Sequence, residues 1–227
     1  ICRNVTDLEE RTRQLEVLDN ILRHNIRNNL NVIYGRGEQI KSVVDGELQN
    51  AADLIIAQAE DLLTTSEKSR AVTDVLTESV VSEPIDIEEL VRSVAQQVTA
   101  EFPETDIAVK GSLEVGVVGI PSLYSALEEL FTNAVIHNDS EEPRLHVELS
   151  AGEKYATLII QDNGPGISTF DKNVLETGDA IDELSHGSGL GLWLVYWAIK
   201  RSGGDISVDY ESEGTKITVR LPLATDS

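Results

Sequence analysis

A long stretch without proline is the feature that most restricts how this chain folds. No proline lies between Leu8 and Ser79, and the one turn signal between long apolar-periodic runs is Asp45-Gly46. A glycine at the end of a helix allows the chain to stop and reverse. This half of the sequence therefore predicts a long antiparallel helical hairpin.

The second arm of this hairpin carries apolar residues at helical spacing. Steps of four and three residues separate Leu48, Ala52, Ile55, Ala59 and Leu62, which is typical of the seam of a helical bundle. Two long helices bury little apolar surface alone, whereas two hairpins together form a four-helix bundle. The pattern favours a homodimer; the alternative is a hairpin packed only on its own second domain.

Two glycines interrupt the first arm. Gly35 and Gly37 each cost about 1 kcal/mol against alanine inside a helix. We therefore expect a bend or a close helix contact near them.

The residues that follow Glu83-Pro84 have a different pattern. A short strand at 85–87 leads into a helix that Asp86 opens, with Glu89 three residues later. Strand-like alternation follows at 145–149, 155–161, 206–210 and 216–221, and amphipathic helices are predicted at 121–138 and 190–201. The fold class expected is α+β: the hairpin, then helices on one face of a mixed, mostly antiparallel sheet.

Composition excludes several classes of protein. The formal net charge of −22 argues against binding to nucleic acid, which requires clustered Lys and Arg. No run approaches the roughly 20 apolar residues of a membrane span. A single cysteine, Cys2, excludes an internal disulfide framework and fits a reducing cytoplasm. The chain begins at Ile1 and has no methionine, so we expect it to be part of a longer protein.

The acidic excess also bears on the host. So many like charges repel one another in dilute buffer and are screened in concentrated salt. This predicts a salt-loving host, with an ordinary acidic protein as the alternative.

One histidine is predicted to face solvent on the first helix. At about 100° per residue, Leu15, Leu22, Ile26 and Ile33 lie within about 20° of one line, and His24 lies about 180° from it. A neutral imidazole, abundant near pH 7, has an unprotonated nitrogen that can attack an electrophile. His24 is therefore a candidate nucleophile, and a solvated surface histidine is the alternative. Its neighbours on the same helix face are Arg27 and Asn28.

Two glycine-rich segments lie in the second half. Asp162-Asn163-Gly164-Pro165-Gly166-Ile167 ends an apolar strand, and its glycines allow the backbone to approach a ligand. The segment 186–192, HGSGLGL, runs directly into a helix, where backbone amides and the helix dipole suit a phosphate chain. Upstream, Glu129 and Asn133 share one helix face and offer oxygen ligands for Mg²⁺.

These three segments, in this order, resemble the N box and the two glycine boxes of the histidine kinase ATPase domain. The resemblance covers about residues 81–223 and implies an α/β sandwich that binds ATP and Mg²⁺. It implies that Asp162 reads the adenine amino group, that Asn133 coordinates Mg²⁺, and that Glu129 assists at the metal or at a water. The nucleotide-binding residues implied are Glu129, Asn133, His137, Asn138, Asp162, Gly164, Gly166, Ile167, Gly187, Ser188, Gly189, Leu190, Gly191 and Leu192.

The helical half is similar to the dimerisation and phosphoacceptor domain of the same kinases. In the segment LRHNIRNNL, the residues His24, Arg27, Asn28 and Leu30 match that pattern, and Asn28 stands where the family orients a water for dephosphorylation of its partner. Asn25 stands in place of an acidic residue thought to assist proton removal, and Asn29 in place of a proline. Asparagine cannot act as a base, so Asn25 bears on the rate of autophosphorylation. The implied catalytic residues are His24, Asn25, Arg27 and Asn28.

The resemblance also suggests a division of the chain. The segment Asn4-Val5-Thr6-Asp7 resembles the end of a PAS sensor module. We expect the end of an upstream sensor and a signalling helix at 1–13, the phosphotransfer hairpin at 14–80 and the ATP-binding domain at 81–227.

The function implied is that of a cytoplasmic sensor histidine kinase core, from a halophilic archaeon. It would autophosphorylate His24 from Mg-ATP and pass the phosphoryl group to an aspartate of a response regulator. Two alternatives stay open: an ATP-driven clamp of the same fold, and a degenerate kinase that acts as a phosphatase or scaffold, which Asn25 motivates.

Overall fold

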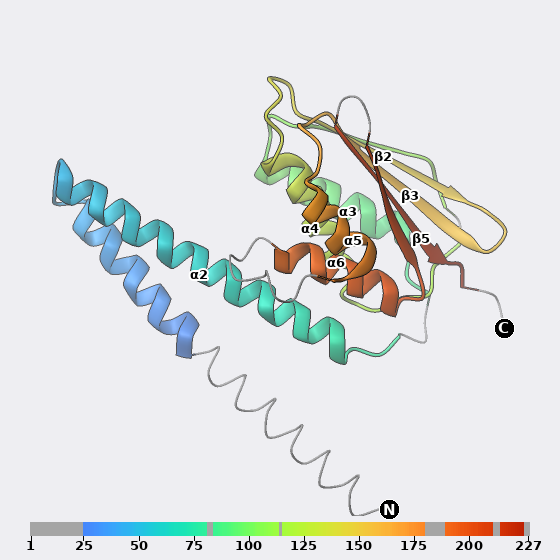
Figure 1. The fold of residues 1–227 in the computed structure, drawn as a ribbon, viewed down its shortest axis with the longest axis horizontal. Helices are drawn as coiled ribbons and strands as arrows, with labels where there is room; N and C mark the ends of the chain where they lie inside the picture. The colour runs from blue at the N-terminus through green and yellow to red at the C-terminus, as the bar shows by residue number, and fades with distance from the viewer. Residues whose placement is uncertain (1–24, 81–83, 114, 180–188, 211–213, 225–227) are drawn as a thin grey trace, which may run out of the picture. The chain divides into compact units, whose positions relative to one another are not determined.

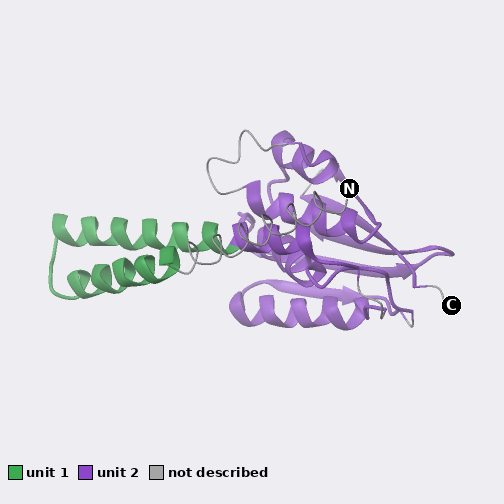
Figure 2. Ribbon diagram, turned by 90° about the horizontal axis from the view of Figure 1, so that it is seen from below, with its two compact units in different colours: residues 1–67 green, residues 68–227 purple. Residues whose placement is uncertain are grey.

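The computed structural model describes residues 25–80, 84–113, 115–179, 189–210 and 214–224. These residues divide into two compact units, 1–67 and 68–227, of which the second holds the sheet (Figures 1 and 2). The division falls inside a long helix, so a domain boundary at 80–81 stays a prediction. His24 lies outside the described residues, as do Gly187 and Ser188.

The first unit contains the predicted hairpin. One helix covers 25–41, the chain turns at 42–46, and α2 (Glu47–Thr77) returns. Gly46 has a φ of +64°, a conformation that glycine adopts at no steric cost, so the reversal occurs where the sequence predicted it. Ion pairs join the arms: Lys41 Nζ lies 2.8 Å from Asp53 Oδ1, and Arg27 Nη2 lies 2.9 Å from Glu67 Oε1.

The buried seam of the hairpin is narrower than the predicted one. Ala52 and Ala59 are buried, together with Leu30 and Ile56, whereas three predicted seam residues are exposed. Those three are Leu48, Ile55 and Leu62.

Only one of the two glycines in the first arm marks a close contact. A Cβ on Gly37 would lie 2.7 Å from Ile56 Cγ1, while a Cβ on Gly35 would meet nothing within 4 Å. Gly37 therefore lets the two arms approach, as a small residue at a helix crossing does.

The second unit is a five-stranded sheet with helices on one face (Figure 1). The strand order is β1-β2-β3-β5-β4, in which β1 and β2 are parallel and the other neighbours antiparallel. The predicted mixed, mostly antiparallel sheet is thus confirmed. Its elements are α3 (Ile87–Glu101), β1 (Asp106–Lys110), α4 (Leu123–Ile136), β2 (Arg144–Ala151), β3 (Tyr155–Asp162), α5 (Thr169–Thr177), α6 (Gly189–Arg201), β4 (Asp205–Tyr210) and β5 (Thr215–Pro222).

Alternation along the strands decides which face the helices cover. In β2 the residues Leu145, Val147 and Leu149 are buried, while His146 and Glu148 between them are exposed. Because successive side chains point to opposite faces, one side of the sheet is apolar and packs against the helices. Phe131 of α4 is fully buried in this core.

The predicted strand at 85–87 is wrong. Ile85 forms an isolated bridge to Val117, and α3 already begins at Ile87. The helix starts there because the Asp86 side chain accepts a hydrogen bond from the Glu89 amide at 2.9 Å, which is an N-cap. The cap at Asp86 was predicted correctly. Because the helix begins at the next residue, 85–87 cannot form a strand.

Candidate functional site

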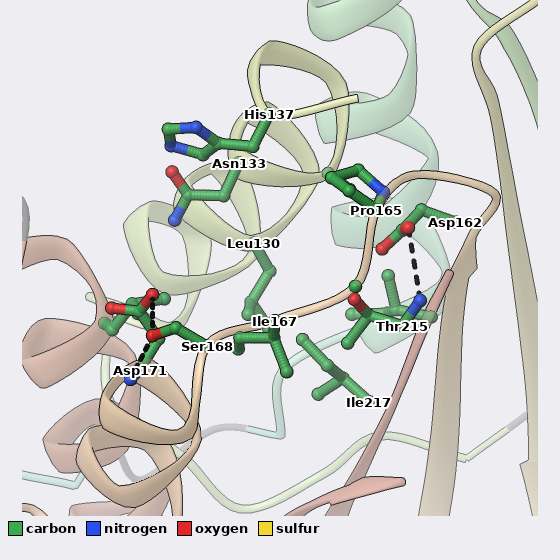
Figure 3. Close-up of a pocket in the computed structure, with 14 residues that line it drawn as sticks. Leu130, Asn133, His137, Asp162, Pro165, Ile167, Ser168, Asp171, Thr215 and Ile217 are labelled. Carbon is green, nitrogen blue, oxygen red and sulfur yellow. Dashed lines mark hydrogen bonds between the residues drawn. The ribbon is translucent and has the colours of Figure 1, made fainter. Parts of the chain in front are cut away.

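A cavity of about 360 Å³ opens between the sheet and its helices (Figure 3). It lies between the end of α4, the turn after β3, the starts of α5 and α6, and β5. The lining residues are Leu130, Asn133, Ala134, His137, Ile160, Asp162, Pro165, Gly166, Ile167, Ser168, Asp171, Leu192, Thr215 and Ile217.

Asp162 ends β3 beside this cavity. Its Oδ1 accepts a hydrogen bond from the amide of Gly164 at 2.8 Å. It also accepts one from the amide of Thr215 at 3.2 Å (Figure 3). Burial raises the pKa of the Asp162 carboxyl above its ordinary value, and the two amides oppose that rise. The carboxylate is therefore held in place by backbone donors, with the cavity beside it.

Glycines let the backbone pass close to Asp162. A Cβ on Gly214, whose φ is +95°, would lie 2.0 Å from the Asp162 carbonyl oxygen. Gly166 also has a positive φ, of +90°. Side chains at these positions would displace the turn that shapes the cavity.

The end of α4 is fastened to the turn after β3 by two asparagines. Asn138 Nδ2 donates to Asn163 Oδ1 at 2.9 Å, and Asn163 Oδ1 also accepts from the Arg144 amide at 2.8 Å. Asn138 Oδ1 accepts from the Ser140 amide. Asn138 is therefore not a lining residue: it holds the turn that carries Asp162.

Glu129 and Asn133 lie one helical turn apart on α4, and only Asn133 lines the cavity. Asn133 Nδ2 donates to Glu129 Oε1 at 3.2 Å. The same oxygen lies 2.6 Å from Lys68 Nζ. A Cβ on Gly191 would lie 1.8 Å from that oxygen, so the Glu129 carboxylate packs against the first turn of α6.

The predicted nucleotide-binding residues therefore divide into three groups. The cavity is lined by Asn133, His137, Asp162, Gly166, Ile167 and Leu192. Near it but outside its lining are Glu129, Asn138, Gly164, Gly189, Leu190 and Gly191. Gly187 and Ser188 lie outside the described residues.

The predicted catalytic residues belong to the hairpin unit. Asn25, Arg27 and Asn28 are exposed on its first helix, and Arg27 is paired with Glu67. Within the described part of the chain no cluster of three or more metal-binding side chains occurs. The described helices also include none whose length and hydropathy would allow it to cross a membrane.

Several lining residues were missed from the sequence. Ser168 caps α5: its Oγ accepts from the Asp171 amide at 3.0 Å and donates to Asp171 Oδ2 at 2.7 Å. A serine three residues before an aspartate is a readable helix start. Thr215 and Ile217 gave no such signal, because only the pairing of β5 with β3 brings them to the cavity.

Comparison with known proteins shows what the chain is similar to. Residues 119–225 match the family model described as histidine kinase-, DNA gyrase B-, and HSP90-like ATPase. The chain is 26% identical over 186 residues to the sensor histidine kinase CpxA of Escherichia coli K12, covering 78% of this chain and 39% of CpxA. It is 35% identical over 103 residues to the sensor protein kinase CarS of Pseudomonas aeruginosa, covering 44% of this chain and 22% of CarS.

The chain is thus similar to sensor histidine kinases, and its residues 119–225 match the ATPase domain type described for histidine kinases, DNA gyrase B and HSP90. It spans well under half the length of either curated relative. Its fold matches the crystal structure of full-length ShkA in complex with AMPPNP, with a TM-score of 0.66 and 21% identity, over 92% of this chain and 46% of ShkA. The helical segment followed by a mixed-sheet domain is therefore a fold that this chain shares with ShkA.

Proposed function

We propose that this chain is the catalytic core of a sensor histidine kinase that transfers the γ-phosphoryl group of ATP to His24 and then to an aspartate of a response regulator. The observation that carries the proposal is the cavity that gathers Asn133, His137 and Asp162 from two separate sequence motifs. The similarity of the chain to histidine kinase-like ATPases and to the sensor histidine kinase CpxA supports the same function.

The cavity suits an adenine nucleotide. Its walls include Leu130, Ile160, Ile167 and Ile217, and a purine ring is flat and mostly apolar. The Asp162 carboxylate beside these walls is an acceptor for an exocyclic amino group. The first turn of α6 offers backbone amides to phosphates.

Mg²⁺ also fits the side chains at the edge of this cavity. Asn133 donates one hydrogen of its side-chain amide to Glu129, and its amide oxygen is a suitable ligand for a metal. Mg²⁺ binds a few protein oxygens together with waters and phosphates, so Asn133 and Glu129 would hold it together with the nucleotide. The ion would neutralise charge on the phosphates.

The transfer itself needs little covalent chemistry from the protein. A neutral imidazole nitrogen of His24 forms a bond to the γ-phosphorus while the bond from that phosphorus to the β–γ bridging oxygen breaks, and ADP leaves with the electron pair. Positioning and charge neutralisation supply most of the catalysis of such a step. Arg27 and Asn28, three and four residues further along, are the proposed polar neighbours of the acceptor.

Incubation with γ-labelled ATP tests the proposal. The chain is expected to acquire an acid-labile label that the His24→Gln variant does not acquire. The matched control is His146→Gln, which removes an exposed histidine from β2 and should leave the label unchanged. ATP hydrolysis without labelling would favour an ATP-driven clamp of the same fold.

Asn25 supports a second candidate, a degenerate kinase that acts as a phosphatase or scaffold. Asparagine cannot take a proton as the usual acidic neighbour does. If the chain dephosphorylates a phosphorylated receiver domain but never labels His24, this candidate replaces the main one.

The wider assignments are parts of the same proposal. We propose a homodimer, a PAS-like sensor upstream, a cytoplasmic location and a halophilic archaeal host. The dimer is supported by the exposed apolar residues of the hairpin, and the host by the net charge of −22.

A further inference from the structure

Among the residues that the structure describes, the cavity lining contains no lysine or arginine that could pair with a phosphate chain. The ionisable residues of this lining are His137, Asp162 and Asp171. Nucleoside di- and triphosphates carry several negative charges, which protein sites balance with Lys, Arg or metal ions. Bound Mg²⁺ would balance part of this charge, whereas the two carboxylates of the lining, Asp162 and Asp171, would repel the phosphates.

A lysine outside the lining is connected to the lining through Glu129, which also accepts a hydrogen bond from the lining residue Asn133. Lys68 belongs to the second unit, in α2, and its Nζ lies 2.6 Å from Glu129 Oε1. The side chains are 26% exposed for Lys68 and 13% exposed for Glu129. An ion pair of this low exposure fixes the ammonium group in one place better than a surface pair does.

The position of this ammonium group points to the phosphates. The oxygen that it contacts also packs against Gly191, so Lys68 Nζ is one hydrogen bond away from an atom that touches the first turn of α6. The amides of that turn form the proposed phosphate site. A lysine ammonium has three donors, so the bond to Glu129 leaves two.

We propose that Lys68 is a phosphate-binding residue of the nucleotide site: its ammonium group pairs with the phosphates of a bound nucleoside di- or triphosphate while the Glu129 carboxylate holds it in place. Glu129 Oε1 accepts the hydrogen bond from Lys68. The second carboxylate oxygen of Glu129 would then be available to the proposed Mg²⁺. The inference rests on the proposed function, because it assumes that the cavity takes an adenine nucleotide. It adds that α2, the helix of the phosphotransfer hairpin, contributes a residue to that site.

The test compares ligands with and without phosphates on the full 227-residue chain. Titration calorimetry with ATP, ADP and adenosine, in saturating Mg²⁺, is run on the wild type and on Lys68→Met, which keeps the apolar stem and removes the charge. The variant should bind ATP and ADP about tenfold more weakly or worse, and adenosine as the wild type does.

Two further variants sharpen the result. Lys68→Arg keeps the charge and should recover most of the affinity for ATP. Lys154→Ala removes an exposed lysine from the turn between β2 and β3 and should change nothing.

Three results would overturn the inference. The first is an unchanged affinity of Lys68→Met for ATP. The second is tighter binding of ATP by this variant, which would mean that the ion pair restrains the site against the nucleotide. The third is a loss of affinity that is equal for ATP and adenosine. A wild-type chain that binds no ATP would overturn the proposed function itself, so the two failures are distinguishable.

Discussion

Asp162 is the residue whose local environment says most about the cavity. It is a carboxylate with a raised pKa that two backbone amides nevertheless hold as an acceptor. Burial disfavours the charged form, and hydrogen bonds to the charged form favour it. Protonation of Asp162 should therefore change both the binding of a nucleotide and the free energy of unfolding.

We predict that nucleotide binding weakens on acidification because of Asp162. The ionised carboxylate is a stronger acceptor than the protonated carboxyl for the proposed bond from the adenine amino group, so affinity for ATP should fall as pH drops through the raised pKa. Asp162→Asn should bind ATP about tenfold more weakly at neutral pH and lose this step in the pH profile. Asp209→Asn, at an exposed position of β4, is the control and should keep both.

The same pKa has a consequence for stability with a definite sign. The folded-state pKa of Asp162 is higher than its unfolded value, so the ionised form costs folding free energy at neutral pH, and this cost disappears as pH falls through the folded pKa. The wild type should therefore gain stability relative to Asp162→Asn on acidification. Urea melts of both proteins from pH 7 downward measure it, and a difference that moves the other way would contradict the assigned shift.

At the scale of helices, α2 belongs to both compact units of the molecule. Its first two thirds pack in the hairpin, while Val75 is fully buried in the core of the second unit. Arg201 of α6 donates to the carbonyls of Leu76, at 2.8 Å, and Glu78. The Glu78 carboxylate in turn accepts from the Ser122 amide at the start of α4. The end of α2 is thus hydrogen-bonded to α4 and α6, the two helices that carry proposed nucleotide-binding residues.

The first part of α2 supports a prediction about assembly. Ile55 and Leu62 lie beside the buried seam and are 46% and 53% exposed. Ile55→Glu and Leu62→Glu should each shift a dimer toward monomer, because a charge in a buried seam is costly. Ala57→Glu, about 160° around the helix from Ile55, should not. Light scattering across a dilution series measures the change; a wild-type monomer at all concentrations would exclude the dimer.

For the whole molecule, the charge balance dominates the response to solvent. The chain has 40 acidic and 18 basic residues. Repulsion between the excess carboxylates weakens the folded state in dilute buffer, and the screening length falls to about 3 Å at 1 M salt.

We therefore predict that the thermal midpoint rises between dilute buffer and about 1 M KCl, as expected for a salt-loving host. Calorimetric melts across a KCl series measure it. Sucrose at equal osmolality is the control, because it is excluded from the protein surface without screening charge. A highest midpoint in dilute buffer would argue for an ordinary acidic protein.

The sequence by itself determined the features that depend on neighbouring residues. Helical spacing and the turn at Gly46 predicted the hairpin, and strand alternation predicted the sheet. The cap at Asp86 was readable because it involves residues three apart. The motifs around Asn133 and Asp162 were readable for the same reason, since each is a short run of adjacent residues, and both contribute to one cavity.

Only the tertiary structure decided which distant residues complete that cavity. Strand pairing brings Thr215 to Asp162, 53 positions away, and helix packing brings Lys68 to Glu129, 61 positions away. Such contacts have no periodic signal, because they depend on how whole elements pack. The same reason explains why Ile55 looked like a seam residue and is exposed in the single chain. Periodicity identifies an apolar face, and packing decides which part of that face a single chain buries.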